Sequence, residues 1–271
     1  MSQEREIYKY ILDLKNGVRR PTRLPETTVY LAPDAGTSGR ETLVREVPTW
    51  VPPAPSTASR MPPARSRGYC RGCIVDARTN RTYVFESSLE RDALCILLAD
   101  RRISAVQDQP PAVSYVGPDG RLRSHTADFR VIRVDGIRIA YAVKPSARVE
   151  KSRIQETLDL IKEQVGAQFA DHYRVLTENE ITKPKAHNAR MILRARRARN
   201  QDDVDTVRRA VPSIGAFKIG DILTVTALGA RGWNAVLNLI DEGVLTVIEP
   251  NGTSRLNEGS LVRASARNGM K

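Results

Sequence analysis

TADFRVIRVDGIRIAYAVK, residues 126–144, carries the strongest structural signal in this chain. The signal predicts two β-strands, 126–134 and 137–144, because β-branched and aromatic residues recur through both halves. Val134-Asp135-Gly136 between them is a turn signal of the kind found in hairpins. The segment therefore predicts an antiparallel hairpin.

The register of this hairpin determines whether two of its polar residues meet. With a two-residue turn, Asp128 pairs with Val143, and Lys144 lies on the opposite face of the sheet. With a three-residue turn and a glycine bulge, Asp128 pairs with Ala142 and shares a face with Lys144. Only the second register, or an equivalent bulge, builds a site from Asp128 and Lys144.

The sequence on both sides of the hairpin predicts a mixed α/β domain. A capping box at Ser87-Ser88-Leu89-Glu90 begins a predicted helix that runs to Asp100. Its apolar face consists of Leu89, Ala93, Ile96 and Leu97. The other predicted elements are a hairpin around Thr79-Asn80, strands near 104–108 and 112–116, a helix over about 151–170, and a strand at Tyr173–Leu176.

Length and composition indicate a folded protein with more than one domain. The chain has 271 residues, of which 41% are hydrophobic and 27% charged, enough for a core and for about two domains. Three cysteines rule out a disulfide framework and fit a reducing cytoplasm. No apolar run approaches the ~18 residues of a membrane span, and the N-terminus lacks a signal-peptide pattern, which disfavours secretion and membrane insertion.

The pattern divides the chain into four segments. Residues 1–69 are predicted to hold an N-terminal helix and a Pro-rich extended arm, because six prolines fall within 48–63. The arm either lies along a partner surface or is an untethered tail. Residues 70–181 form the mixed α/β domain, residues 182–210 an Arg-rich linker helix, and residues 211–271 a small winged-helix-like domain.

The winged-helix prediction depends on the order of elements near the C-terminus. Gly243 is an expected cap at the end of the second helix, and a β-branched strand follows it. The predicted elements are a helix at Ile219–Leu223, a turn at Leu228–Gly232, a helix at Trp233–Asp241, a strand at Val244–Ile248, a turn at Asn251-Gly252, and a return strand beginning at Ser254-Arg255-Leu256.

Positive charge makes an acidic partner, and nucleic acid first of all, the expected one. The net charge is +12, and residues 182–210 hold 9 basic and 3 acidic side chains, which is half of it. A solvated linker helix is the alternative reading of this segment. The predicted DNA-binding residues are Arg190, Arg194, Arg196, Arg197 and Arg199, together with Arg231 and Asn234 on the second helix of the C-terminal domain.

Two acidic residues and a lysine form the candidate catalytic group. Glu90 lies near the start of the first core helix, Asp128 enters a strand, and Lys144 lies on the next strand. Two carboxylates can hold Mg²⁺ against a phosphodiester, and a nearby lysine can orient water and stabilise charge on phosphorus. Taken singly, Glu90 could cap its helix, Asp128 could be a turn residue, and Lys144 could be a surface residue.

A zinc site is the weaker hypothesis. Cys70 and Cys73 have the CxxC spacing of zinc ligands, but the sequence contains no second pair. Two ordinary free cysteines are the alternative. The remaining ligand candidates are scattered: Cys95, His125, His172 and His187.

Residues of about 70–181 resemble the N-terminal domain of the TnsA transposon-end endonucleases. The winged-helix outline at 211–264 is similar to that family's C-terminal domain. The motifs that carry the resemblance are, in chain order, Phe85-Glu86-Ser87-Ser88-Leu89-Glu90-Arg91-Asp92, Gln109-Pro110, Asp128-Phe129, Val143-Lys144-Pro145 and Leu176-Thr177-Glu178-Asn179-Glu180-Ile181.

The resemblance implies a restriction-endonuclease-like fold and Mg²⁺-dependent DNA cleavage, with Mn²⁺ as a substitute. Such an enzyme nicks the 5′ ends of a transposon while a partner transposase cuts the 3′ ends, and a AAA+ ATPase regulator joins them. Glu90, Asp128 and Lys144 would inherit the catalytic roles, with Glu90, Asp128 and the Val143 carbonyl as metal ligands. The expected location is the bacterial cytoplasm, in association with the nucleoid.

One position departs from the family pattern. Two residues before the lysine the family has Glu or Gln, whereas this chain has Ala142, and a methyl group cannot bind metal. The Val143 carbonyl, a water, or a carboxylate from elsewhere, with Glu86 and Glu150 as candidates, would have to substitute. The alternative function is therefore an inactive nuclease fold that bridges DNA and proteins in a mobile-element or phage assembly.

Overall fold

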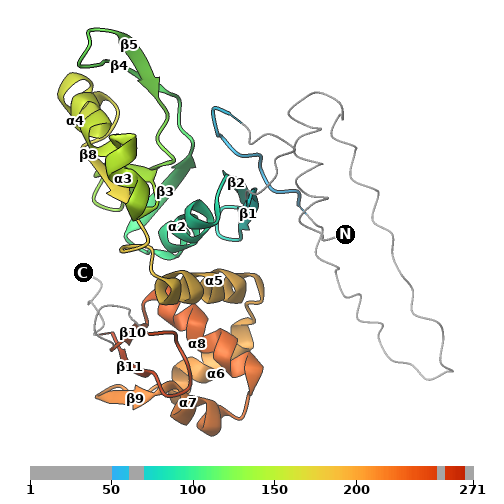
Figure 1. The fold of residues 1–271 in the computed structure, drawn as a ribbon. Coiled ribbons are helices and arrows are strands. Elements are labelled where there is room, and N and C mark those ends of the chain that lie inside the picture. The colour runs from blue at the N-terminus through green and yellow to red at the C-terminus, as the bar shows by residue number, and fades with distance from the viewer. Residues whose placement is uncertain (1–50, 61–69, 249–253, 266–271) are drawn as a thin grey trace, which may run out of the picture.

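The computed structural model describes residues 51–60, 70–248 and 254–265. In Figure 1 these residues form two lobes, with helix α5 (Lys183–Arg197) between them. The predicted N-terminal helix and the Asn251-Gly252 turn lie outside the described residues. Within the described ranges, no helix is both long enough and apolar enough to cross a bilayer.

The N-terminal lobe is built on a four-stranded mixed sheet. Its strand order is β3-β6-β7-β8, with antiparallel pairing between the first three strands and parallel pairing between β7 and β8. Parallel neighbours need a crossover connection, which α4 provides. The predicted α/β class is confirmed. The strands are β3 (Ile103–Asp108), β6 (Phe129–Arg133), β7 (Arg138–Val143) and β8 (His172–Leu176).

The central hairpin has the register that brings Asp128 and Lys144 to one face. Phe129 pairs with Tyr141, and Ile132 pairs with Arg138, which leaves a three-residue turn at 134–136. Gly136 has a φ of 85°, a conformation that glycine adopts without steric cost. The three-residue register is thus confirmed.

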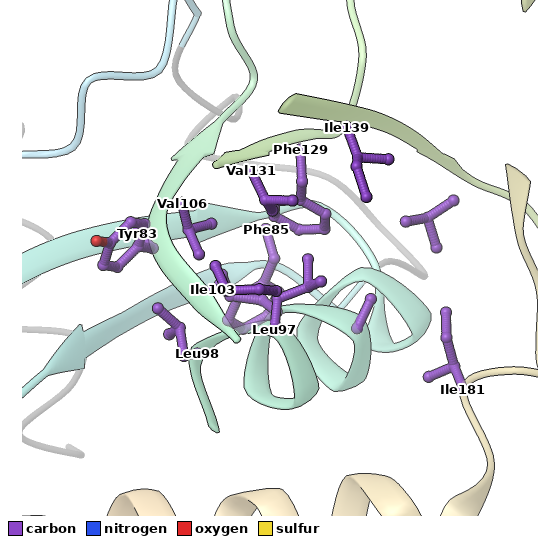
Figure 2. Packing of buried hydrophobic residues seen from close by; sticks show 13 residues of the cluster. Tyr83, Phe85, Leu97, Leu98, Ile103, Val106, Phe129, Val131, Ile139 and Ile181 are labelled. Carbon is purple, nitrogen blue, oxygen red and sulfur yellow. The ribbon is translucent and has the colours of Figure 1, made fainter. Parts of the chain in front are cut away.

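Helix α2 (Ser88–Ala99) covers one face of this sheet. The Ser87 side chain accepts a hydrogen bond from the Glu90 N–H, as the capping box predicts. Figure 2 shows the apolar side chains that fill the space between α2 and the sheet. The predicted apolar face was too narrow, because Leu94 and Leu98 also join the cluster against the sheet and α5 packs against α2 as well. The additional buried residues are Leu94, Cys95 and Leu98.

Two short helices replace the single helix predicted at 151–170. Helix α3 (Ser146–Ser152) ends at Arg153, whose left-handed φ of 52° interrupts the helical path before α4 (Ile154–Gln164) begins. Gly166, with a φ of 50°, then starts the short 3-10 turn η1 (Gly166–Gln168). The predicted helix was wrong in length because helical spacing of apolar residues does not register these backbone breaks.

Two further hairpins extend the lobe. Strands β1 (Gly72–Asp76) and β2 (Arg81–Phe85) pair around Thr79-Asn80 as predicted. Strand β4 (Val113–Val116) confirms the strand predicted near 112–116. It pairs with β5 (Leu122–His125), a strand that the sequence did not predict, and this hairpin projects from the lobe in Figure 1. The strand predicted at 126–134 is correspondingly shorter and begins at Phe129.

The described part of the Pro-rich arm, residues 51–60, lies along its own lobe. Ala54 forms an isolated parallel bridge with Arg81. The Ser56 hydroxyl donates a hydrogen bond of 2.7 Å to the Asp108 carboxylate, and both residues are buried. The surface along which residues 51–60 lie is therefore that of the N-terminal lobe of the same chain.

The C-terminal lobe combines three helices with a small antiparallel sheet of order β10-β11-β9. Gly243 caps the last helix with a φ of 74°, as predicted. Strand β9 was not predicted, the last helix begins inside the predicted turn, and the return strand begins at Leu261 rather than Ser254. The elements are α6 (Gln201–Ala210), β9 (Ala216–Lys218), α7 (Ile219–Thr226), α8 (Ala230–Glu242), β10 (Leu245–Val247) and β11 (Leu261–Ala264).

The segment 182–210, predicted as one linker helix, folds as two helices. Asn200 caps the start of α6 and separates it from α5. Helix α5 packs against α2 on one side and α8 on the other, so it is part of the packing of both lobes. Val204 and Val207 of α6 are fully buried in the core of the C-terminal lobe.

Candidate active site

Glu90 lies in the first turn of α2 and performs its capping role. Its carboxylate accepts hydrogen bonds from the Glu86 N–H at 2.8 Å and the Ser87 hydroxyl at 2.9 Å. Burial nevertheless raises its pKa, an effect that these hydrogen bonds and the Lys144 charge oppose. Glu90 is therefore a cap whose carboxylate also feels a cation from another element.

Asp128 lies at the junction of three strands. Its N–H donates to the Tyr141 carbonyl, and its carbonyl accepts from the Gln109 N–H, both at 2.9 Å. Its carboxylate accepts from the Val143 N–H at 2.7 Å. Burial, and then the charge of Glu90, raises the pKa of Asp128 to about 7. The sheet thus holds a carboxylate where its ionised form is unfavourable.

Lys144 follows β7, and its N–H donates to the Leu176 carbonyl at 3.0 Å. Its positive charge lowers the pKa of Asp128 and of Glu90, against the stronger effect of burial on both. The three predicted catalytic residues therefore act on one another electrostatically, although they come from three different elements. This electrostatic interaction defines the candidate site.

Ala142 occupies the position, two residues before Lys144, where a third acidic group was expected. Its side chain is fully buried against Ile154 and Leu158 of α4. A carboxylate here would lose its hydration among apolar groups. Helix α4 thus packs on the sheet at the position where the resemblance led us to expect a Glu or Gln.

The two proposed replacements for that group are placed differently. Glu86 precedes α2, and its charge contributes to the raised pKa of Glu90, behind the larger effect of burial. Glu150 is exposed on α3. Val143 is buried and holds Asp128 through its N–H, while metal binding by its carbonyl stays a prediction. Glu86 is the acidic side chain that the structure connects to the site.

The carboxylates of Glu90 and Asp128 offer few ligand atoms, which suits a cation that keeps much of its bound water. Among the described residues, no group of three or more His, Cys, Asp and Glu is arranged to hold a metal ion. Mg²⁺ often uses only one or two carboxylates and completes its shell with water and substrate phosphate. Burial raises the pKa of both carboxylates, and the charge of Glu90 adds to the effect at Asp128; a cation would relieve this, so Glu90 and Asp128 fit the predicted Mg²⁺.

The cysteines do not form a zinc group within the described residues. Cys70 is exposed, Cys73 is half-buried, and Cys95 is buried in α2. Burial raises the pKa of the Cys95 thiol to about 11, which keeps it protonated at neutral pH. The CxxC spacing of Cys70 and Cys73 alone therefore does not indicate a zinc site.

Three residues beside the site were not predicted as part of it. Arg60 of the arm contacts Glu86 and Gln109. Gln109 is buried and has a φ of 37°, an unusual conformation for a residue with a side chain. His125 lies at the end of β5, and burial and the Lys144 charge lower its pKa. The sequence signals for these residues were the Gln109-Pro110 motif and the inclusion of His125 among the scattered candidates for a zinc ligand.

Most of the predicted DNA-binding arginines are occupied by partners inside the protein. Arg196 is buried, with its side chain 7% exposed, and forms ion pairs with Asp76 and Asp241. Its role is structural, contrary to the prediction. The other contacts are Arg190 to Asp92, the Arg197 guanidinium to the Val75 carbonyl, and Arg199 to Glu242.

Arg194 differs from these neighbours. It is exposed, and no partner for it is found among the described residues. Arg231 pairs with Asp203 of α6, and Asn234 lies in the same shallow hollow. Helix α5 packs against α8, whereas the first two residues of α8, Ala230 and Arg231, are exposed.

Comparison with known protein families finds no family model that matches this chain. Comparison with curated proteins finds no match.

The pKa of Asp128 predicts how stability depends on pH when no divalent metal is present. Because this pKa is about 7 rather than the ordinary 3.8, the folded state binds the Asp128 proton more tightly than the unfolded state. Stability is therefore lost as pH rises from about 4 to about 7. Asp128→Asn should be the more stable form at pH 8, by at most about 4 kcal/mol, and should lose this advantage below about pH 4.

Urea unfolding in EDTA at pH 4 and pH 8 measures this difference. Asp171 provides the matched control, because its hydrogen bond to Arg138 lowers its pKa to about 2. Asp171→Asn should gain no stability at pH 8. An Asp128→Asn protein that is no more stable than wild type at pH 8 would show that the Asp128 charge is well solvated in solution.

Proposed function

We propose that this protein is a Mg²⁺-dependent DNA endonuclease of the TnsA type, which nicks the 5′ ends of a transposon. The observation that carries the proposal is the electrostatic influence of Glu90, in α2, and of Lys144, which follows β7, on Asp128, which directly precedes β6 and is held by the Val143 N–H. Two carboxylates and a lysine that influence one another are groups that metal-assisted hydrolysis of a phosphodiester can use. Perturbed carboxylates of this kind are enriched at functional sites.

The order of elements supports the same proposal. The N-terminal lobe runs helix, strand, strand, strand, helix, strand through α2, β3, β6, β7, α4 and β8, which is compatible with a restriction-endonuclease-like core. The C-terminal lobe runs α6, β9, α7, α8, β10, β11 with sheet order β10-β11-β9. That order is compatible with a winged helix, a common DNA-binding unit.

The chain's own groups would perform distinct tasks in the reaction. Glu90 and Asp128 would hold Mg²⁺, which when bound supplies charge to stabilise the phosphate and lowers the pKa of water. Lys144 would orient the attacking water and stabilise negative charge on the phosphate oxygens. The Val143 N–H fixes the Asp128 carboxylate, so that little reorganisation is needed when substrate binds.

The partners follow from the same resemblance. A transposase would cut the other strand, and a AAA+ ATPase regulator would join the complex on DNA. The net charge of +12 favours association with DNA. Arg194 and the exposed start of α8 are the described parts of the predicted interface that could contact the backbone.

A second candidate function is a catalytically inactive nuclease fold that bridges DNA and protein partners in a mobile-element or phage assembly. The observation in its favour is the packing of Ala142 against α4, which leaves the expected third acidic position apolar. This candidate predicts DNA binding without cleavage. The two functions therefore differ in a single measurable property.

A nicking assay separates the two functions. The full chain, with the cognate transposase, should cut one strand of transposon-end DNA in Mg²⁺ or Mn²⁺ and should be inactive in EDTA. A Glu150→Gln protein should keep its activity, because Glu150 is exposed on α3. DNA binding with no strand cut under any of these conditions would identify the inactive bridging module.

A further inference from the structure

Arg60 extends from the Pro-rich arm to the edge of the candidate active site. Its Nε–H donates to the Gln109 side-chain oxygen at 3.2 Å, and its guanidinium forms an ion pair with Glu86 at the same distance. Its charge also lowers the pKa of Asp128, against the larger effect of burial. A segment distant in sequence thus brings a cation to the carboxylates.

The arm is anchored by the residues that precede Arg60. The Ser56 hydroxyl donates to the buried Asp108 carboxylate at the end of β3. The Ser59 N–H donates to the Gln109 carbonyl at 2.8 Å, and its hydroxyl donates to the Pro110 carbonyl. Arg60 therefore directly follows residues that are hydrogen-bonded to the end of β3 and to the two residues after it.

Gln109 gives a second, independent sign that this edge receives a ligand. Its residue is 2% exposed, yet its side-chain nitrogen has no hydrogen-bond partner among the described residues. Buried polar groups normally have partners, and strained backbone conformations concentrate at functional sites. The unusual φ of 37° at Gln109 therefore occurs where its side chain meets that of Arg60. The Gln109 side-chain nitrogen remains available as a donor.

The Arg60 guanidinium is only partly used by these contacts. Nε–H and one terminal nitrogen face Gln109 and Glu86, whereas the other terminal nitrogen has no partner among the described residues. The side chain is 59% exposed. Arginine presents its donors in a rigid planar fork that matches phosphate oxygens. Two donors orient the group, and the remaining donors face solvent.

We propose that Arg60 binds a backbone phosphate of the DNA beside the bond that is cut, and that the Pro-rich arm delivers it in cis. Gln109 and Glu86 orient the guanidinium for this contact. The inference deepens the proposed nuclease function and rests on it. It also gives the arm a role in binding substrate.

The test compares wild type, Arg60→Ala, Arg60→Lys and Arg102→Ala. Arg102 is a matched control, because it is an exposed arginine bound to a carboxylate, Asp100, at the opposite end of α2. Binding to a transposon-end duplex is measured in EDTA at several KCl concentrations, and nicking is measured in Mg²⁺. Thermal unfolding confirms that each variant is folded.

Arg60→Ala should reduce the slope of log K against log salt by about 0.9, the value for one lost phosphate contact. It should also reduce nicking by about 10-fold. Arg60→Lys should keep the slope and lose part of the rate, because an ammonium cannot hold Gln109 and Glu86 as a planar fork does. Arg102→Ala should change neither property.

Each other outcome is decisive. An Arg60→Ala protein with the wild-type salt slope would overturn the phosphate contact, even if nicking falls, because Arg60 would then only position Glu86. If wild type binds DNA but does not nick it, the nuclease proposal fails. In that case the salt slope alone still accepts or rejects Arg60 as a phosphate ligand.

Discussion

Asp128→Asn is expected to nick transposon-end DNA at least ~10²-fold more slowly than wild type, while its DNA affinity changes little. The amide can still accept the hydrogen bond that the Val143 N–H gives to the carboxylate, so the local fold should remain. What is lost is the negative charge that would hold a divalent cation. A single-turnover nicking assay at saturating protein measures this effect, and a binding isotherm in EDTA measures the affinity.

Lys144→Ala provides a second measurement of the same site. It removes the cation that lowers the pKa of both Asp128 and Glu90 and should reduce nicking by a similar factor, about 10²–10³. Lys151→Ala is the control, because Lys151 is exposed on α3 and should have no effect. Wild-type nicking in both Asp128→Asn and Lys144→Ala would assign the activity to another part of the chain.

The hairpin at the centre of this site was predictable because its signals agree. β-branched residues indicate the strands, glycine indicates the turn, and the alternation of Phe129 and Val131 places Asp128 on the other face. The sequence left two registers open, and the observed pairing of Phe129 with Tyr141 selects one. The apolar residues on the α2 side account for that choice, since a shift by one residue would expose them.

The contribution of the arm was not predictable by the same reasoning. The spacing of apolar residues indicates which face of a helix or strand is buried, but residues 51–60 show neither the helical nor the strand spacing. Their position depends on single contacts such as Ser56 with Asp108, made across a long separation in sequence. Proline content predicted extended backbone and could not identify which surface the arm lies on.

The arginine-rich segment illustrates a different limit of composition. A count of charges predicts attraction to phosphate, but it does not report which charges are already paired. Arg190 and Arg196 reach carboxylates from the N-terminal lobe, Asp92 and Asp76. The positive charge of residues 182–210 therefore fits a segment that joins the two lobes as well as it fits a segment that binds DNA.

Arg196→Ala is expected to destabilise the protein by about 3–5 kcal/mol. Arg196 forms ion pairs with Asp76 at the end of β1 at 3.1 Å and with Asp241 in α8 at 2.6 Å. All three side chains are at most 10% exposed. Removing the guanidinium leaves the buried Asp76 carboxylate without a cation among the described residues and leaves Asp241 with only the longer pair to Arg78, at 3.4 Å, which costs more than the intact pairs contribute. Urea unfolding at pH 7 measures the loss.

Two further variants test this explanation of Arg196. Arg208→Ala breaks an exposed pair with Glu242 and should cost less than about 1 kcal/mol. Asp76→Asn, added to Arg196→Ala, should recover part of the lost stability, because it removes the buried charge that Arg196 alone paired. If Arg196→Ala were as stable as wild type, the two lobes would not depend on this ion-pair network. Arg196 would then return to the residues available for DNA.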